Sequence, residues 1–450
     1  CRGEWTHWDP KITTPPGLYL IGLFFSWIQH SLVLPAMDLI VGGQNSQLHE
    51  ECSTVVLRGS NIMLLLLSVE LLAALLSCGG GKRDSGYWMA CSILASPWIL
   101  FFSLVYYTDV GALFAVLLHL GLCQLRFGTH FPELSGSLMS HCGWQFLLLS
   151  TSLFCVLFRQ TNVVWVAYGA SASEISALQR WAASKGWGPC SLLAFFCRAG
   201  YRHLYAIICG LLVVAFVIWN GGVVLGDREN HIAGAHLMQA GYMAVFLAVC
   251  SLPYTLLSFD RNEWRMLFSP RWRVVGGTVS LVCLLVSLFR WMAQHFTVVH
   301  PFLLADNRHL PFYLWKNFLS KESIREVYAP VLYAAAVGFL VLFAVRKGVT
   351  GREQSSLVAG RHILWILFSL VATVPSPLIE FRYFIIPTTL WFLNTMTPES
   401  MDSSHPSPSV SHRSIVLVTV LNLLLTVFVV FIFVHRPFLW PDGSVARFIL

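Results

Sequence analysis

The sequence predicts an all-α polytopic membrane protein with about 12 transmembrane helices. Only 11% of its 450 residues are charged and 56% are hydrophobic, whereas soluble domains carry about 25% charged residues. The mean hydropathy is +0.66. Apolar runs of roughly 20 residues, the length of one span, recur from end to end. These runs are continuous rather than alternating, which disfavours a β-barrel.

The expected spans follow one another with short connections. The run 110–125 is short and could pair with its neighbour as a tight hairpin. We place the spans at 17–36, 57–77, 87–107, 110–125, 144–158, 163–178, 203–219, 238–258, 274–294, 328–345, 362–375, 383–395 and 414–434.

The connecting stretches are of two kinds. One kind is basic, such as "GGGKRDSG" and the stretch 180–202. The other mixes acids, amides, Arg and His with aromatic residues, as in "VYYTDV", "FRQTN", "NGGVVLGDRENH" and "IEFRYF". Counted back from the last residue, the two kinds alternate. The positive-inside bias assigns the basic loops to the cytosol and the mixed loops to a lumen or exterior.

The alternation of the two kinds of loop fails before residue 57, because the expected spans there include one membrane crossing more than the alternation allows. Either 17–36 is a re-entrant or interfacial hairpin, or one span boundary is wrong. We treat 1–450 as one integral membrane domain. The Ser/Pro-rich stretch 394–413 is expected to be a flexible cytosolic loop.

Several function classes are excluded by what the sequence lacks. The 12 cysteines form no CxxC pair, and no Cys/His spacing suits a metal site. The glycines of "NGGVVLGDR" lack the strand–helix setting of a phosphate loop. The net charge of +7 is spread over short loops, so a nucleic-acid partner is not expected.

The densest polar cluster is "LADNRH", which lies between two apolar runs. Arg308 and His309 could bind a phosphate, since Arg offers a planar fork of donors. The alternative interpretation is an ordinary solvated loop with no binding role. The surrounding aromatic residues favour a helix in the membrane interface instead.

A second cluster, "IEFRYF", places Glu380 and Arg382 beside an apolar run. Arg382 could be a second cation for an anionic headgroup, with flanking prolines opening backbone to a cavity. The alternative is an interface anchor in which Arg382 snorkels and Glu380 is its partner.

Three further stretches carry candidate residues. Asp9 and Lys11 of "WDPKITTPPG" could contact a substrate, or form only an Asp-Pro turn. Arg159 of "FRQTN" lies at a helix junction, where the simplest interpretation is a helix-end cap. The simplest interpretation of Asp109 in "YYTD" is a helix N-cap beside an aromatic belt.

These motifs occur in an order that resembles a known family. "WDPKITTPPGLYL", "YYTD", "FRQTN", "NGGVVLGDR", "LLADNRH" with "FYLWK", "EFRYFIIP" and the closing "FLWPDGSVARFIL" are similar to the dolichyl-phosphate-glucose-dependent α-1,2-glucosyltransferases of the asparagine-linked glycosylation pathway. The resemblance covers essentially the whole chain.

The resemblance implies a GT-C enzyme of the endoplasmic reticulum membrane with a lumenal active site. It would transfer glucose from dolichyl phosphate glucose to the diglucosylated diphosphodolichol-linked oligosaccharide, with inversion, and without a metal or other cofactor. Arg308, His309, Arg382 and Arg159 would then bind the donor phosphate. The residues expected to contact sugar or orient those cations are Asp9, Lys11, Asp109, Asp306 and Glu380.

Two departures from the family pattern qualify this expectation. The family's acidic pair, the expected source of the catalytic base, would precede Cys1 together with a first span, so the base is not assigned. Leu310 and Pro311 replace a more polar pair after His309, and Pro311 would shift the local backbone. Two other readings stay open: a catalytically silent or shortened membrane partner, and a secondary transporter or channel-associated protein.

Overall fold

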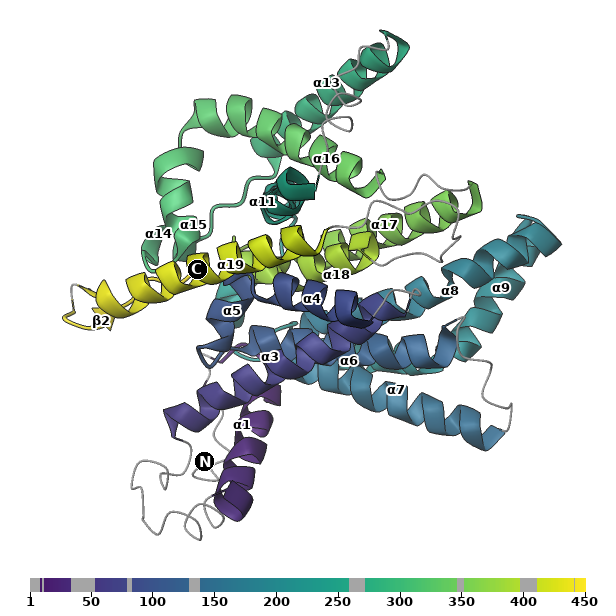
Figure 1. Cartoon of the computed structure of the whole chain (residues 1–450), viewed down its shortest axis with the longest axis horizontal. Helices are drawn as coiled ribbons and strands as arrows, with labels where there is room; N and C mark the ends of the chain where they lie inside the picture. Colours follow the sequence, from purple (N-terminus) through teal and green to yellow (C-terminus); the bar gives the residue numbers. More distant parts are fainter. Residues whose placement is uncertain are drawn as a thin grey trace. The chain divides into compact units, whose positions relative to one another are not determined.

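The computed structural model describes residues 9, 12–33, 53–78, 83–128, 138–258, 272–345, 352–396, 411–440 and 442–450. Within these residues the regular structure is helical apart from one short hairpin, β1 (Phe438–Leu439) and β2 (Val445–Ala446). Figure 1 shows the helices in sequence colours. They are α1 Gly17–Ile28, α3 Thr54–Ser77, α4 Arg83–Leu94, α5 Pro97–Ser103, α6 Thr108–Phe127, α7 Leu138–Phe158, α8 Val163–Lys185, α9 Pro189–Arg202, α10 Leu204–Asn220, α11 Gln239–Ser258, α13 Trp272–His295, α14 Pro301–Ala305, α15 Leu310–Leu314, α16 Ala329–Val345, α17 Arg352–Thr373, α18 Ile385–Met396 and α19 His412–His435.

The prediction of a helical chain with several membrane-capable helices is confirmed. Among the described residues, six helices are long and apolar enough to cross a bilayer, and up to eight if each bent pair is one span. The expected span 110–125 is the 20-residue helix α6, which packs against its neighbour α7. The expected span 87–107 is broken, because α4 and α5 meet at a bend of 78°. The start of the expected span 17–36 is the 12-residue helix α1.

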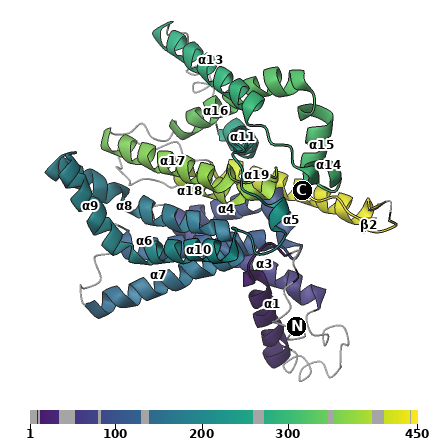
Figure 2. The same ribbon diagram turned by 180° about the vertical axis from the view of Figure 1, so that it is seen from behind.

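The chain divides into two compact units. Unit 1 holds residues 1–78 and 102–232. Its centre is α6, which packs against α3, α7 and α8 and contributes fully buried residues such as Leu113 and Leu117. The fit is close at Gly111, where a Cβ atom would lie 2.2 Å from the Phe158 ring. In both views α9 lies alongside α8 (Figure 1, Figure 2).

Unit 2 holds residues 79–101 and 233–450. In this unit α16 packs against α11 and α13, α17 against α18, and α19 against α4 and α11. Buried hydrogen bonds connect these helices, including Trp365 Nε1 to the Pro387 carbonyl at 2.8 Å. The hydroxyl groups of Ser92 and Tyr254 lie 2.7 Å apart.

The basic stretch 180–202 is not an irregular loop, as the sequence analysis assumed. It contains the last turn of α8 and the whole of α9. Most of the predicted cytosolic loop 394–413 lies outside the described residues, which end at 396 and resume at 411.

Candidate functional site

The "LADNRH" cluster forms a local ion pair in unit 2. Asp306 Oδ1 accepts hydrogen bonds from the backbone nitrogen of Arg308 at 3.1 Å and from its Nε at 2.9 Å. Asp306 Oδ2 accepts from Arg308 Nη2 at 2.7 Å, and His309 Nε2 lies 3.4 Å away. This two-pronged contact fixes the plane of the guanidinium. Asp306, which the resemblance gave as a sugar contact or as an orienting residue, is thus paired with Arg308 and His309.

Two short helices hold the cluster in place. It lies between α14 and α15, and both helices carry a proline in the first turn, where the missing N–H costs no helical bond. Pro311 therefore fits its backbone. Partial burial alone would raise the pKa of Asp306, but hydrogen bonds from Arg308 and His309 outweigh burial and hold the pKa below its ordinary value. The carboxylate stays ionised at neutral pH.

The last residues of the chain pack on this cluster. Ile449 pairs with His309 as a parallel bridge, with its nitrogen donating to the Arg308 carbonyl at 2.8 Å. Trp440 Nε1 donates to Asn307 Oδ1 at 3.0 Å, and the Arg308 guanidinium lies 4.8 Å from the Trp440 ring centroid. An indole face attracts a cation at this distance. Trp440 therefore contacts two neighbouring residues of the cluster.

The tail, residues 436–450, is itself anchored to α19. Arg447 Nη1 donates to the carbonyl groups of Phe433 and Val434 at 2.8 and 2.9 Å. The hairpin turns at Gly443, whose φ of +81° favours glycine. The sequence analysis used this tail only as a family resemblance and missed its contact with the cluster.

The "IEFRYF" cluster is a second ion pair of unit 2. Arg382 Nε donates to Glu380 Oε2, and both side chains are mostly buried. The preceding loop is paired with the segment before α11: Gly234 N donates to the Pro375 carbonyl at 3.0 Å and His236 N to Val374 at 3.1 Å. The pairing of Glu380 with Arg382 was expected, and it fits either the anchor or the anion-binding interpretation.

The third pair, Asp109 with Arg159, belongs to unit 1. Arg159 Nη2 lies 2.8 Å from Asp109 Oδ1, and the Asp109 side chain is 1% exposed. Asp109 lies inside the first turn of α6, and Tyr107 holds the N-cap position. The N-cap interpretation of Asp109 is therefore wrong. A buried carboxylate needs such a cation because an unpaired charge there is costly.

The mixed stretches of unit 1 meet one another. The Thr13 carbonyl accepts hydrogen bonds from Gln160 Nε2 at 3.0 Å and from Leu225 N at 3.2 Å. Tyr106 donates its hydroxyl to the Leu18 carbonyl at 2.7 Å. Three stretches that the sequence analysis assigned to one membrane face are thus in contact, within this unit, with residues 13–18, whose side of the membrane it left open.

The remaining candidates carry less structural information. Asp9 is exposed, and its carbonyl accepts a hydrogen bond from Ile12 N at 2.9 Å. Lys11 lies outside the described residues. Across the part of the chain that the structure describes, no group of three His, Cys, Asp or Glu side chains could hold a metal ion.

The structure thus provides three cations, each held by a carboxylate, in stretches rich in aromatic residues. A model of the DIE2/ALG10 family matches residues 1–393. The chain belongs to the DIE2/ALG10 family. This confirms the family resemblance drawn from the motifs.

Three relatives illustrate the similarity, and each is named a Dol-P-Glc:Glc(2)Man(9)GlcNAc(2)-PP-Dol α-1,2-glucosyltransferase. The Yarrowia lipolytica protein is 29% identical, covering 100% of this chain and 90% of its own length. The Mus musculus protein is 30% identical, covering 99% and 88%. The Arabidopsis thaliana protein is 28% identical, covering 100% and 92%. No solved structure matches this member of the DIE2/ALG10 family.

Proposed function

We propose that this chain transfers glucose from dolichyl phosphate glucose to the diglucosylated diphosphodolichol-linked oligosaccharide and forms the terminal α-1,2 linkage. The observation that carries the proposal is similarity over the whole chain to relatives named for that reaction. The loops that contain the three ion pairs support the proposal, because the motifs that resemble the family lie in the same loops. The enzyme would work in the endoplasmic reticulum membrane with its site facing the lumen.

The proposed architecture is of the GT-C type with about 12 spans. In the part of the chain that the structure describes, six long helices, two bent pairs and the shorter apolar helices 279–295 and 359–373 supply up to ten of these crossings. The mixed loops would form the lumenal side, where the lipid-linked donor and acceptor present their sugars. The basic stretches would face the cytosol.

The reaction itself is one displacement at the anomeric carbon of the donor. The 2-hydroxyl of the acceptor glucose attacks this carbon while the bond to the phosphate oxygen breaks, so a β-linked donor yields an α-linked product. The electron pair leaves with dolichyl phosphate, and a general base takes the hydroxyl proton. Fixed donors facing the leaving phosphate would lower the barrier, because charge builds there in the transition state.

We assign the leaving phosphate first to Arg308 and His309, with Arg382 and Arg159 as second choices. The Arg308 side chain is 37% exposed even while paired with Asp306, so a phosphate can reach it. A guanidinium has five N–H donors and can serve a carboxylate and a phosphate together. Asp306, Glu380 and Asp109 would orient the cations, and Asp9 and Lys11 would contact sugar.

The test is glucose transfer by the purified chain in lipid nanodiscs. Dolichyl phosphate glucose and the diglucosylated acceptor are supplied, and product one hexose larger is measured by mass spectrometry. Arg308→Ala should lower kcat/KM about 10²-fold, as loss of one transition-state donor does. The matched control is Lys321→Ala, an exposed cation of the same unit, which should keep its activity.

Two outcomes would contradict the proposal. No transfer by the unmodified chain would favour the silent membrane partner. Full activity of Arg308→Ala would refute the assignment of the phosphate site while leaving the reaction intact.

A further inference from the structure

A bend between α9 and α10 in unit 1 is the starting point. The two helices meet at 79° across His203, which caps both. His203 itself is neither proline nor glycine, the residues that cause most sharp kinks, although Gly200 lies in the last turn of α9. Contacts from neighbouring helices are therefore expected to hold the break.

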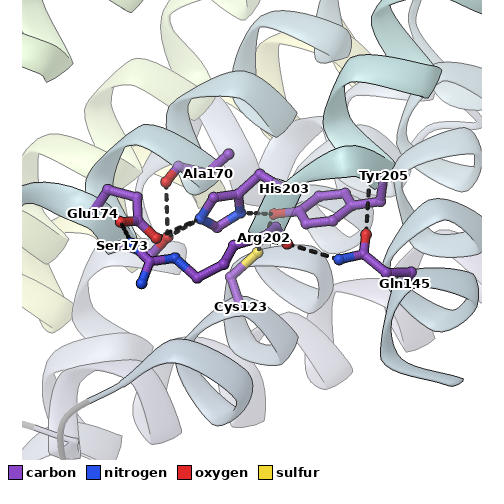
Figure 3. Close-up of polar contacts among 8 residues, drawn as sticks. All are labelled: Cys123, Gln145, Ala170, Ser173, Glu174, Arg202, His203 and Tyr205. Atoms are coloured by element: carbon purple, nitrogen blue, oxygen red, sulfur yellow. Dashed lines mark hydrogen bonds and ion pairs between the residues drawn. The ribbon is translucent and has the colours of Figure 1, made fainter. Parts of the chain in front are cut away.

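A buried polar network holds it (Figure 3). Glu174 of α8 accepts hydrogen bonds from Arg202 and, at 2.9 Å, from His203 Nε2. Gln145 of α7 donates to the Arg202 carbonyl at 2.8 Å and accepts from Tyr205 N at 3.0 Å. These are backbone groups that a broken helix leaves without helical partners. The network therefore stabilises the bend specifically.

The network continues into α6. The Tyr205 hydroxyl lies 3.2 Å from His203 Nδ1 and 3.3 Å from Cys123 Sγ. Glu174, His203 and Tyr205 are all buried. Three helices thus fix the direction in which α9 leaves α10.

The helix held in this way is amphipathic. Leu193, Phe196 and Tyr201 are 66%, 59% and 59% exposed, and their spacing places them along one stripe of the helix. The other side carries Phe195, which is buried and lies 5.9 Å from the Trp181 ring of α8. One face of α9 therefore packs on α8 and another is apolar and uncovered within the described residues.

The exposed stripe continues onto α10. Leu204, Ile207 and Leu211 of α10 are also exposed and follow the spacing of one helix face. Because α10 is half of a candidate broken span, this face would meet acyl chains. The exposed apolar surface thus extends from α10, which is half of a candidate span, onto α9.

Uncompensated positive charge surrounds the hairpin formed by α8 and α9. Arg180, Lys185 and Arg198 are exposed, and Arg198 lies over the Trp181 ring at 5.7 Å. No acidic residue occurs between Glu174 and Asp227 in the sequence, and Glu174 is already paired with Arg202 and His203. Basic residues beside an amphipathic helix are the features that attract anionic lipid surfaces.

We infer that α9 and the end of α8 form an interaction surface for anionic phospholipid headgroups, with the bend holding α9 in the plane of the membrane surface. The apolar stripe enters the headgroup boundary, and the three exposed cations contact lipid phosphates and carboxylates. This inference stands independently of the proposed glucosyl transfer, since it uses none of the same residues.

The test is hydrogen–deuterium exchange on the full chain in two kinds of nanodisc. One contains phosphatidylcholine alone, and in the other about one lipid in five is phosphatidylserine. Amides of α9 should exchange at least about fivefold more slowly in the second, because each basic residue adds attraction to an anionic surface. Amides of α6 should exchange equally in both and report an intact fold.

The charge variant Arg180→Gln, Lys185→Gln, Arg198→Gln should lose this difference. The matched control is Lys316→Gln, Lys321→Gln, Arg436→Gln, which removes three exposed cations of unit 2 and should keep it. Equal α9 exchange in both nanodiscs overturns the inference and leaves an acidic protein partner as the occupant. A difference in α9 exchange between the two nanodiscs that persists in the charge variant also overturns the inference.

A second variant tests the bend. Gln145→Leu removes the hydrogen bonds of Gln145 to the Arg202 carbonyl and to Tyr205 N. It should therefore speed amide exchange in α9 in phosphatidylserine nanodiscs. Ser150→Ala, at an exposed position of the same helix α7, is its control. Unchanged α9 exchange in Gln145→Leu would refute the role of the network.

Discussion

At the scale of single residues, the candidate phosphate-binding cations of each unit lie in preformed ion pairs. Arg308, Arg382 and Arg159 are each held by a carboxylate. Such pairing leaves the cation able to bind a substrate phosphate, because a guanidinium can bind a second anion. It also keeps the cation in one orientation. A site arranged before the substrate arrives stabilises charge without having to reorganise.

The orienting role of Asp306 can be tested separately from charge. Asp306→Asn keeps the shape of the side chain but weakens its hold on the Arg308 guanidinium. We expect the KM for dolichyl phosphate glucose to rise about tenfold, as for loss of one charge-assisted hydrogen bond. Steady-state kinetics would measure it, with Glu322→Gln, an exposed acid of the same unit, as control. An unchanged KM would mean that Asp306 does not position the phosphate contact.

A buried histidine gives unit 2 a pH dependence. His236 is fully buried in the loop before α11, and burial lowers its pKa to about 4, against a smaller opposing effect of the Ser376 and Pro377 backbone. Its native pKa lies below the unfolded value near 6.5, so the stability it contributes is complete above about pH 6.5 and is lost as the pH falls towards 4.

We therefore expect the folded state to lose about 2 kcal/mol between pH 7 and pH 5 through His236. Thermal unfolding of the purified protein at both pH values would measure the change. In His236→Gln the pH dependence over this range should shrink. An identical shift of Tm in the variant and the parent chain would assign the dependence to other groups.

At the scale of elements, the tail acts as a strap across α14 and α15. It connects α19, through Arg447, to the backbone of Arg308 and Leu310. A movement of α19 would therefore reach the candidate phosphate contact directly. This connection lies within unit 2 and rests on paired backbone as well as side chains.

Trp440 provides the test of this strap. Trp440→Ala removes both its hydrogen bond to Asn307 and its ring beneath Arg308, and we expect about a tenfold rise in donor KM. Trp440→Phe keeps a ring for the cation and should recover part of the loss. Leu439→Ala, at the exposed neighbouring position, should match the parent chain. Equal KM values for all variants would contradict the strap.

Close packing inside unit 1 yields a stability prediction. Gly111→Ala would place a Cβ atom 2.2 Å from the Phe158 ring, whereas a Cβ at Gly121 of the same helix has no neighbour within 4 Å. Gly111→Ala should destabilise the protein by about 1–3 kcal/mol through overpacking. Gly121→Ala should be neutral or slightly stabilising. Comparing Tm values in nanodiscs checks both, and similar Tm values for the pair would contradict the packing argument.

The sequence predicted those elements and contacts that depend on nearby residues. The apolar runs predicted α3, α6, α11 and α19 to within a few residues, and the pairs Asp306–Arg308 and Glu380–Arg382 lie two positions apart. The bend at His203 was missed because its partners come from α7 and α8. Trp440 was missed because 133 residues separate it from Asn307. Such contacts depend on tertiary packing, and no local pattern encodes them.

At the scale of the whole molecule, the mixed stretches follow a common rule in both units. In unit 1, Gln160 and Leu225 each donate a hydrogen bond to the Thr13 carbonyl. In unit 2, the segment before α11 pairs with the loop after α17, and the tail pairs with the cluster before α15. Each unit therefore brings together polar stretches that lie far apart in the sequence. This is the arrangement that an enzyme acting on lipid-borne sugars at a membrane surface would use.

The proposed topology can be tested with glycosylation acceptor sites. Ile232→Thr makes Asn230 of unit 1 the first residue of an Asn-His-Thr acceptor, and Asp442→Asn creates an Asn-Gly-Ser acceptor in unit 2. Asn230 lies in a mixed stretch and residue 442 in the tail that packs on the "LADNRH" cluster, so both variants should be glycosylated in the endoplasmic reticulum lumen. Arg83→Asn creates an Asn-Asp-Ser acceptor in a basic stretch and should remain unmodified. Mobility with and without endoglycosidase treatment measures the result, and modification of Arg83→Asn with no modification of the other two would invert the proposed orientation.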